Sequence, residues 1–262
     1  EQFTRPHSEG RAPLPSRMIQ TEPRGRVLII RLDRADKRNA LTPKMLATLV
    51  SHLDTAASAR ALVLSGVGSV FCAGFDLSLC RDDSSALRDL LTGLSRAVRA
   101  MRSAHCPVIL SAHGAAVAGG CALAIAADIV ITTPDARLGY PVVRLGISPA
   151  VNAPLVRAAI GDGPTRARLL DSALITGERA LSIGLAHELA PDPAACEDRA
   201  IRIAEELAEK PPHALAFTKR WLNELDGTDN PRAFDTALEV SLSLHGGVEE
   251  RDRLEQLWAA RN

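Results

Sequence analysis

The chain is poor in aromatic residues and carries no net charge, and these two features limit the partners it can have. Phe, Trp and Tyr make up only 3% of the 262 residues, so few side chains could stack on nucleic-acid bases. Lys and Arg number 31, as do Asp and Glu, so no net field attracts nucleic acid or an anionic membrane. The remaining composition, 46% hydrophobic and 24% charged, predicts a globular protein with a sizeable core.

The sequence also lacks cysteine and histidine at metal-ligand spacing. An odd number of cysteines without a CxxC pair argues against a disulfide framework and against a zinc site. We expect each cysteine to be a small buried side chain in a reducing compartment, which favours a cytoplasmic protein without bound metal. The five are Cys72, Cys80, Cys106, Cys121 and Cys196.

One long apolar run resembles a membrane span. Residues 107–127 carry no formal charge when His113 is neutral, and this length would cross a bilayer. The run is rich in Ala and is interrupted by Pro107 and by glycines, so a buried strand, a glycine turn and a buried helix are favoured over a transmembrane helix. Residues 1–20 hold three prolines and no apolar stretch, which predicts a disordered tail and no signal peptide.

Predicted strands and helices alternate along most of the chain. Alternation at this spacing indicates right-handed βαβ crossovers, a mainly parallel sheet and an α/β fold. After residue 190 the pattern becomes helical and polar-faced, so we expect an α/β core over residues 21–190 and a helical oligomerisation region over residues 191–262. The predicted strands cover residues 26–32, 61–65, 108–112 and 129–132, and the predicted helices cover residues 43–57, 87–101, 122–127 and the chain beyond 197.

Two glycine turns follow predicted strands and are the best candidates for a binding site. FCAGFDL (residues 71–77) follows the strand ALVLS, and HGAAVAGGC (residues 113–121) follows the strand VILSA. Glycines at the ends of parallel strands let backbone amides approach a ligand, and two amides that converge on one oxygen form an oxyanion hole. The alternative is that both turns are tight connections without a ligand. No P-loop or complete dinucleotide fingerprint is present.

Five segments in order resemble motifs of the enoyl-CoA hydratase/isomerase (crotonase) superfamily, and the resemblance extends over roughly residues 24–245. It implies a crotonase-like spiral of ββα units, with a C-terminal helical trimerisation region that forms a homotrimer or a dimer of trimers. It also implies an acyl-CoA substrate, with coenzyme A as part of that substrate and no separate cofactor. The segments are residues 32–41, 71–77, 113–124, 141–147 and 175–180.

The resemblance assigns roles to particular residues. The backbone N–H groups of Phe75 and Gly119 match the two oxyanion donors, which would stabilise an enolate formed from the thioester. Lys37, Arg38 and Ala40 match positions that line the nucleotide end of coenzyme A in the family. Ala73, Asp76 and Leu77 match positions beside the pantetheine and the thioester.

The chain departs from the family where hydratases carry two glutamates. Ala122 and Val142 occupy those positions beside the acyl group, and neither can move a proton for the addition of water. Ala150 stands where the related dehalogenases have an aspartate, and Ala118 replaces a glycine. We therefore expect an acyl-CoA lyase or isomerase with enolate chemistry that needs no glutamate pair, decarboxylation being the simplest. The alternatives are a CoA-thioester-binding pseudoenzyme or accessory subunit, and a hydratase with rewired residues.

Few other side chains could replace the glutamates. Tyr140, the only tyrosine, precedes Pro141 in the segment that lines the pocket, and it is either a catalytic group or a packed side chain. Ser148 and Asn152 are more typical of loop caps, Asp76 and Asp128 of turn anchors, and residues 81–83 of a solvated charge cluster. His105 and His113 are more typical of hydrogen-bonded structural histidines. Apolar stripes in the C-terminal region predict helical interfaces between subunits, the alternative being that they pack back on the core of the same subunit. The stripes are Ile201, Ile203 and Leu207; Trp221, Leu222 and Leu225; and Leu254, Leu257 and Trp258.

Overall fold

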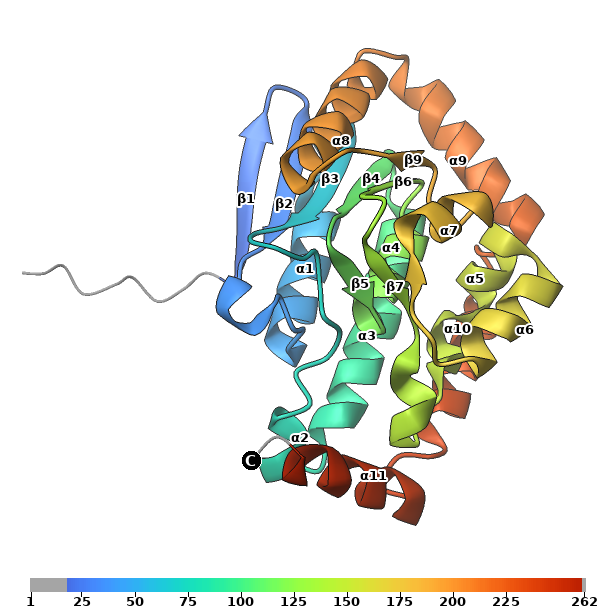
Figure 1. The fold of residues 1–262 in the computed structure, drawn as a ribbon. Helices are drawn as coiled ribbons and strands as arrows, with labels where there is room; N and C mark the ends of the chain where they lie inside the picture. Colours follow the sequence, from blue (N-terminus) through green and yellow to red (C-terminus); the bar gives the residue numbers. More distant parts are fainter. Residues whose placement is uncertain (1–17, 261–262) are drawn as a thin grey trace, which may run out of the picture.

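A computed structural model describes residues 18–260, and its centre is a six-stranded sheet (Figure 1). β1 and β2 form an antiparallel hairpin, and every further pairing in this sheet is parallel, as the alternating pattern predicts. The predicted tail lies mostly outside the described residues, but β1 already begins at Ile19, so the boundary at residue 20 is wrong. In sheet order the strands are β1 (Ile19–Arg24), β2 (Val27–Leu32), β3 (Ala61–Gly66), β4 (Val108–Ala112), β6 (Ile129–Thr132) and β9 (Glu188–Leu189).

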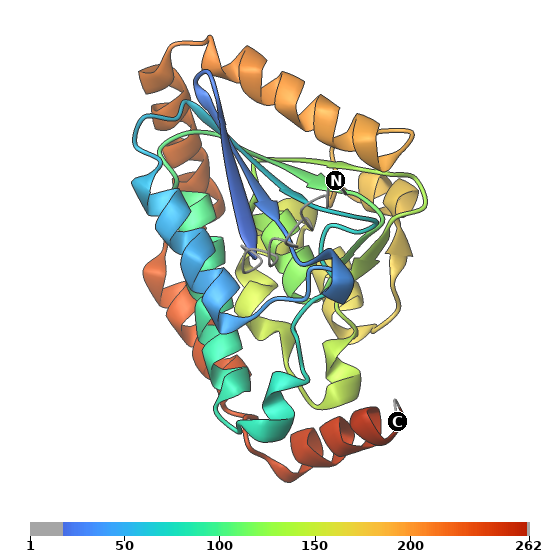
Figure 2. The same cartoon turned by 90° about the vertical axis from the view of Figure 1, so that its left-hand side faces the viewer.

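Helices cover both faces of this sheet, and Figure 2 shows the layers from the side. α1 (Pro43–Thr55) and α3 (Ala86–Ser103) pack on one face through large buried side chains such as Leu46 and Leu90. α1 starts where the sequence predicts, because the Thr42 side chain accepts a hydrogen bond from the Met45 amide and Pro43 opens the helix. Every residue of β3 and β4 is buried, which explains why these strands are short, continuous apolar runs.

α8 (Pro193–Ala208) covers the opposite face and corrects one prediction. Ile201 and Ile203 are buried against Ile29, Val63 and Ile109 of the sheet in the same chain. The stripe of Ile201, Ile203 and Leu207 therefore completes the core, because the second face of the sheet needs an apolar cover. This stripe is not available to another subunit, and packing against the core continues past residue 190.

A second, smaller sheet contains β5 (Ala115–Val117), β7 (Arg137–Gly139) and β8 (Ile175–Thr176). β4 continues into β5 and then α4 (Gly119–Ala126), and β6 continues into β7 before the next helical segments. These two turns thus use one strand from each sheet followed by a helical segment, which matches the predicted ββα unit. The apolar run of residues 107–127 is divided among β4, β5 and α4, and no helix within residues 18–260 is long and apolar enough to cross a membrane.

Shorter elements and the C-terminal helices complete the chain. The helices before residue 190 in this group are short, whereas the C-terminal helices α9, α10 and α11 are longer. They are η1 (Ala35–Lys37), α2 (Leu79–Asp82), η2 (Pro141–Leu145), η3 (Pro149–Asn152), α5 (Ala153–Ile160), α6 (Asp162–Leu170), α7 (Gly177–Ser182), α9 (Pro212–Asp226), α10 (Pro231–Leu242) and α11 (Val248–Ala259).

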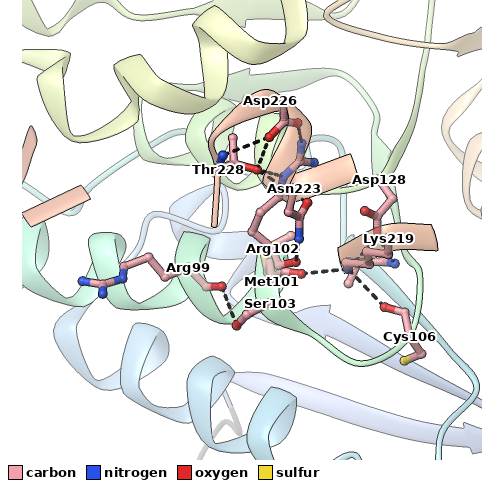
Figure 3. Close-up of polar contacts among 11 residues, drawn as sticks. Arg99, Met101, Arg102, Ser103, Cys106, Asp128, Lys219, Asn223, Asp226 and Thr228 are labelled. Carbon is pink, nitrogen blue, oxygen red and sulfur yellow. Dashed lines mark hydrogen bonds and ion pairs between the residues drawn. The ribbon is translucent and has the colours of Figure 1, made fainter. Parts of the chain in front are cut away.

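Polar contacts attach α9 to the body of the protein (Figure 3). The buried Lys219 ammonium donates to the Met101 and Cys106 carbonyls, each at 3.1 Å, and to the Asp128 carboxylate at 2.7 Å. Asp128 also accepts from the Val108 amide at 2.7 Å, so it anchors the turn before β6 as the sequence predicts. Because the ammonium uses all three of its protons, α9 is fixed in position at the end of α3.

The apolar stripe of α9 remains exposed. Trp221, Leu222 and Leu225 are 57%, 54% and 64% exposed, and Phe217 is 61% exposed. The buried residues of this helix are the polar Lys219 and Asn223 instead. Of the three predicted stripes, the one on α9 is the only one within residues 18–260 whose three apolar residues are all exposed. The stripe on α8 packs in the core, and Leu254 of the stripe on α11 is buried.

Replacing Lys219 tests this anchor. Lys219→Met would leave the Asp128 carboxylate without its cation and two buried carbonyls without a donor. We expect the free energy of unfolding to fall by about 3 kcal/mol, which lowers the melting temperature by several degrees. Lys210→Met, at an exposed lysine just beyond α8, is the matched control and should change stability by less than about 0.5 kcal/mol. Equal melting temperatures for the two variants would contradict the anchoring role.

Candidate active site

The two glycine turns predicted from the sequence lie directly against each other. Backbone hydrogen bonds join them, from the Phe71 amide to the His113 carbonyl at 2.9 Å and from the Cys72 amide to the Ala115 carbonyl at 3.0 Å. The Cys72 carbonyl in turn accepts from the Val117 amide at 3.0 Å. The approach requires glycine, because a Cβ at Gly120 would lie only 2.7 Å from the Cys72 carbonyl oxygen.

Phe75 and Gly119 meet at this junction. A Cβ on Gly119 would lie 2.9 Å from the Phe75 ring, so a side chain at this position would push that ring aside. Leu41 binds the residues on either side of Phe75, donating to the Gly74 carbonyl and accepting from the Asp76 amide. This pairing turns the Phe75 amide away from Leu41. Within residues 18–260, neither the Phe75 nor the Gly119 N–H has a hydrogen-bond acceptor.

Ala118 makes the sharp turn that presents Gly119. It has φ +50° and ψ −112°, a conformation that costs a non-glycine residue about 1–3 kcal/mol. The hydrogen bond from its amide to the Gly139 carbonyl at 2.8 Å holds it there. As a result α4 begins at Gly119, with the unpaired first-turn N–H groups and the positive end of the helix dipole at the junction.

A small, mainly apolar cavity lies next to the two amides. About 30 Å³ of it is available to the centres of water molecules. Tyr140 is the one ionisable residue among those described that line it. Nine of the lining residues lie in segments or at positions singled out from the sequence, and four do not. The nine are Phe75, Ala118, Gly119, Ala122, Tyr140, Val142, Ile147, Ser148 and Asn152, and the four are Leu91, Leu94, Pro149 and Val151.

The Tyr140 hydroxyl is buried and bonded to a side chain. Burial raises its pKa well above the ordinary value of a tyrosine, the neighbouring Cys121 acts in the same direction, and Asn152 acts against it. Tyr140 is therefore protonated at neutral pH and cannot serve as a general base. Asn152 donates from Nδ2 to the hydroxyl oxygen at 2.5 Å, so the prediction of a loop cap is wrong for Asn152. It is right for Ser148, which accepts from the Ala150 amide.

The residues matched to coenzyme A gather outside this cavity, in a loop beside the first glycine turn. Lys37 and Arg38 are exposed, and Arg38 has a left-handed backbone with φ +53°. The Arg38 carbonyl accepts from the Ala73 amide at 3.0 Å, which joins the two segments. Ala40 is half-buried, and Leu77 packs against the apolar cluster around Leu87. None of these residues lines the inner cavity.

Asp76 connects the same two segments through its side chain. Burial raises its pKa, but hydrogen bonds from Ser78 and the charge of Arg34 outweigh burial, so the pKa lies below its ordinary value. The Arg34 guanidinium is 2.7 Å from the Asp76 carboxylate and donates to the Ala40 carbonyl at 3.0 Å. Asp76 is therefore ionised, and it anchors a turn as predicted.

The two histidines singled out from the sequence are structural. His113 is buried next to the Gly68 carbonyl at 3.1 Å, and burial lowers its pKa, so the ring is neutral. His105 binds the Ala59 carbonyl at 3.0 Å. Arg81 stacks over Trp258 of α11, and Asp82 and Asp83 are exposed, so residues 81–83 form the solvated cluster that was predicted.

Known proteins resemble this chain over most of its length. Residues 22–250 match the family described as enoyl-CoA hydratase/isomerase. A putative enoyl-CoA hydratase of Thermus thermophilus is 34% identical over 217 residues, which are 80% of this chain and 85% of that protein. The 2,3-dehydroadipyl-CoA hydratase of Escherichia coli is 30% identical over 236 residues, which are 85% of this chain and 91% of that protein.

A solved structure agrees over nearly the whole chain. An enoyl-CoA hydratase/isomerase from Mycobacterium paratuberculosis superposes with a TM-score of 0.84 at 26% identity, covering 94% of this chain and 100% of that one. Pseudomonas aeruginosa OdaA superposes with a TM-score of 0.82 at 26% identity, covering 92% and 99%. The residues that match the family include both glycine turns and the residues that line the cavity. This chain belongs to the enoyl-CoA hydratase/isomerase family, the crotonase superfamily.

Proposed function

We propose that the protein binds an acyl-CoA thioester, stabilises its enolate with the Phe75 and Gly119 amides, and does not hydrate enoyl-CoA. The observation that carries the proposal is the cavity wall. Ala122 and Val142, which stand where hydratases have glutamates, both line the cavity, and Tyr140 is the ionisable residue described there. Addition of water needs one group that deprotonates water and another that delivers a proton to carbon. A protonated tyrosine supplies only the second.

Decarboxylation is the simplest reaction that suits these residues. The bond between the α-carbon and the carboxyl group breaks, CO₂ leaves, and the electron pair passes to the thioester oxygen as an enolate. Two fixed amides stabilise that oxygen, and one such donor contributes about 3–4 kcal/mol to a transition state. The apolar wall favours neutral CO₂ over the starting carboxylate. Tyr140 then gives its proton to the α-carbon and recovers one from water.

The coenzyme A part of the substrate lies along the loop that carries Lys37 and Arg38. Exposed cations at this loop suit a phosphorylated nucleotide. The contact to Ala73 uses the Arg38 backbone carbonyl, so the Arg38 side chain remains available to bind a phosphate. The second candidate is a CoA-thioester-binding protein without turnover. The small volume of the cavity favours this candidate, because it leaves little room for a reacting acyl group.

We further propose that the subunits assemble as a trimer or a dimer of trimers through α9. Its exposed stripe of Trp221, Leu222 and Leu225 is a larger apolar surface than scattered residues produce on a monomer. A groove between this helix and the core is lined by apolar residues such as Ile125, Leu155 and Leu222 and by charged residues such as Arg102 and Asp226. A neighbouring subunit that covers the stripe would bury these side chains without changing the polar anchor of α9.

Two CoA thioesters test the proposed reaction. Hydration of crotonyl-CoA should be at background, since two acid–base groups each worth about 10²–10⁴-fold are missing. Malonyl-CoA should release CO₂ faster than without protein. The double variant Ala122→Glu and Val142→Glu should raise the hydration rate, while each single variant should change it little, because the chemistry needs both groups. The rates are measured by ultraviolet absorbance of the enoyl thioester and by mass spectrometry of the products.

The controls separate binding from turnover. Calorimetric titration with acetyl-CoA reports whether the thioester binds at all, and it should do so in the unaltered protein and in both single variants. Hydration of crotonyl-CoA by the unaltered protein at the rate of an efficient hydratase would refute the proposal. Binding without release of CO₂ from malonyl-CoA would favour the non-catalytic candidate.

Light scattering tests the proposed assembly. The particle mass at micromolar concentration should be three or six times the 27.9 kDa of one chain. Leu222→Glu places a charge in the stripe and should shift the protein towards monomers, since burying an unpaired charge at an interface is unfavourable. Val248→Glu, at an exposed residue on α11, is the matched control and should leave the mass unchanged. A stable 27.9 kDa monomer of the unaltered protein would refute the assembly.

A further inference from the structure

A second space, the outer cleft, shares a wall with the inner cavity beside the two amides. It measures about 390 Å³, against about 30 Å³ for the inner cavity. Glu249 is the one charged residue among the described residues that line it. Most of the lining is apolar, and its large side chains include Val143 of η2, Leu169 and Leu170 at the end of α6, and Leu244 just after α10.

A single stretch of chain forms the shared wall. Val142 lines the inner cavity, whereas its neighbour Val143 lines the outer cleft. Further along, Ala150 lines the outer cleft and Val151 the inner cavity. Residues 147–149 line both spaces. The wall is therefore one residue thick at these three positions, which we call the partition.

The backbone of the partition is fixed from outside by α10. The buried Ser241 hydroxyl donates to the Ser148 carbonyl at 3.1 Å and accepts from the Val151 amide at 2.9 Å. Ile147 and Ser148 lie between η2 and η3 and belong to neither helix. The Ile147 side chain packs in a small apolar cluster that is separate from the main core. A change of its rotamer breaks none of these hydrogen bonds, so the partition can open at Ile147 while the backbone stays in place.

The outer cleft keeps apolar side chains in contact with water. Leu170 is 71% exposed and Leu244 is 47% exposed, and they come from two different elements. Apolar surface is stabilised when it leaves water, so the cleft favours an apolar occupant, and the Glu249 carboxylate disfavours an anionic one. Because the cleft continues the inner cavity across the partition, an apolar chain that starts at the two amides reaches it.

We infer that the outer cleft holds the distal part of the acyl chain, which passes the partition at Ile147, so the site takes medium-chain acyl-CoA thioesters of about eight carbons. This inference rests on the proposal that the thioester lies at the Phe75 and Gly119 amides. The inner cavity then holds only the first carbons of the chain, and its small volume no longer limits the acyl group.

Two thioesters that differ only in chain length provide the test. Calorimetric titration of the whole protein should give at least about tenfold tighter binding of octanoyl-CoA than of butyryl-CoA. Each methylene group that leaves water contributes up to about fourfold in affinity, and octanoyl-CoA has four more of them. The expected ratio is lower than the full product because the Ile147 side chain must turn.

Charges placed in the outer cleft should remove this preference. Leu170→Glu and Leu244→Glu each put a carboxylate beside the acyl tail, and both positions are exposed, so the variants should fold. Val240→Glu is the matched control, because Val240 is 48% exposed on α10 but lines a different groove, next to α5. It should keep the preference for octanoyl-CoA.

A truncation at the partition tests the route of the chain. Ile147→Ala removes the side chain that has to turn, so the ratio of octanoyl-CoA to butyryl-CoA affinity should rise by at least about threefold. Ile160→Ala is an equal truncation in α5 at a residue that lines neither space, and it should leave the ratio unchanged. An unchanged ratio in a folded Ile147→Ala variant would contradict passage at this residue.

The outcomes separate this inference from the proposed function. Failure of the unaltered protein to bind either thioester would refute acyl-CoA binding itself. Equal affinity for the two thioesters, or a preference that survives both Leu170→Glu and Leu244→Glu, would refute the outer cleft as the tail site and leave acyl-CoA binding intact. A particle mass that falls in Leu244→Glu but not in Val240→Glu would also refute it, since another subunit would then cover the cleft.

Discussion

The close contact between two glycine turns is the constraint on which the rest of the site depends. Backbone hydrogen bonds hold residues 71–77 against residues 113–121, and Gly119 and Gly120 leave no space for a side chain at the junction. Parallel strands β3 and β4 deliver the two turns to the same edge of the sheet. The strained Ala118 then starts α4 with its first amides unpaired. A fold that made either turn looser would have no two amides fixed beside one cavity.

The cavity and the surrounding loop divide recognition between them. The loop near Arg34 is polar and tied to the first turn by the ion pair with Asp76, which suits the charged part of a CoA thioester. The cavity is mainly apolar, with Ala122 and Val142 in its wall, and burial keeps Tyr140 protonated. On the proposed function, the site stabilises charge on the thioester oxygen, and none of the described residues that line the cavity is a strong base. On this proposal, the chain differs from a hydratase in a few side chains of the cavity wall.

The sequence predicted the backbone of the site better than its side chains. β4 and β6 and the start of α1 occur where the apolar runs and the Thr42–Pro43 signal indicate, since burial and capping act locally. The two- and three-residue strands of the second sheet were missed, because so short a segment has no periodicity. α8 was taken for part of an interface because an apolar stripe does not reveal which surface covers it. The pairing of Asn152 with Tyr140 depends on how η3 folds back, and no motif records that.

Affinity for an enolate mimic tests the central claim most directly, because it measures the oxyanion donors without requiring turnover. A CoA thioether that ends in a planar nitronate carries negative charge where the enolate oxygen would lie, whereas acetyl-CoA has a neutral carbonyl there. If the Phe75 and Gly119 amides converge on that oxygen, the nitronate should bind at least about 100-fold more tightly than acetyl-CoA, as expected for a mimic of a transition state. Equal dissociation constants for the two ligands would contradict the account.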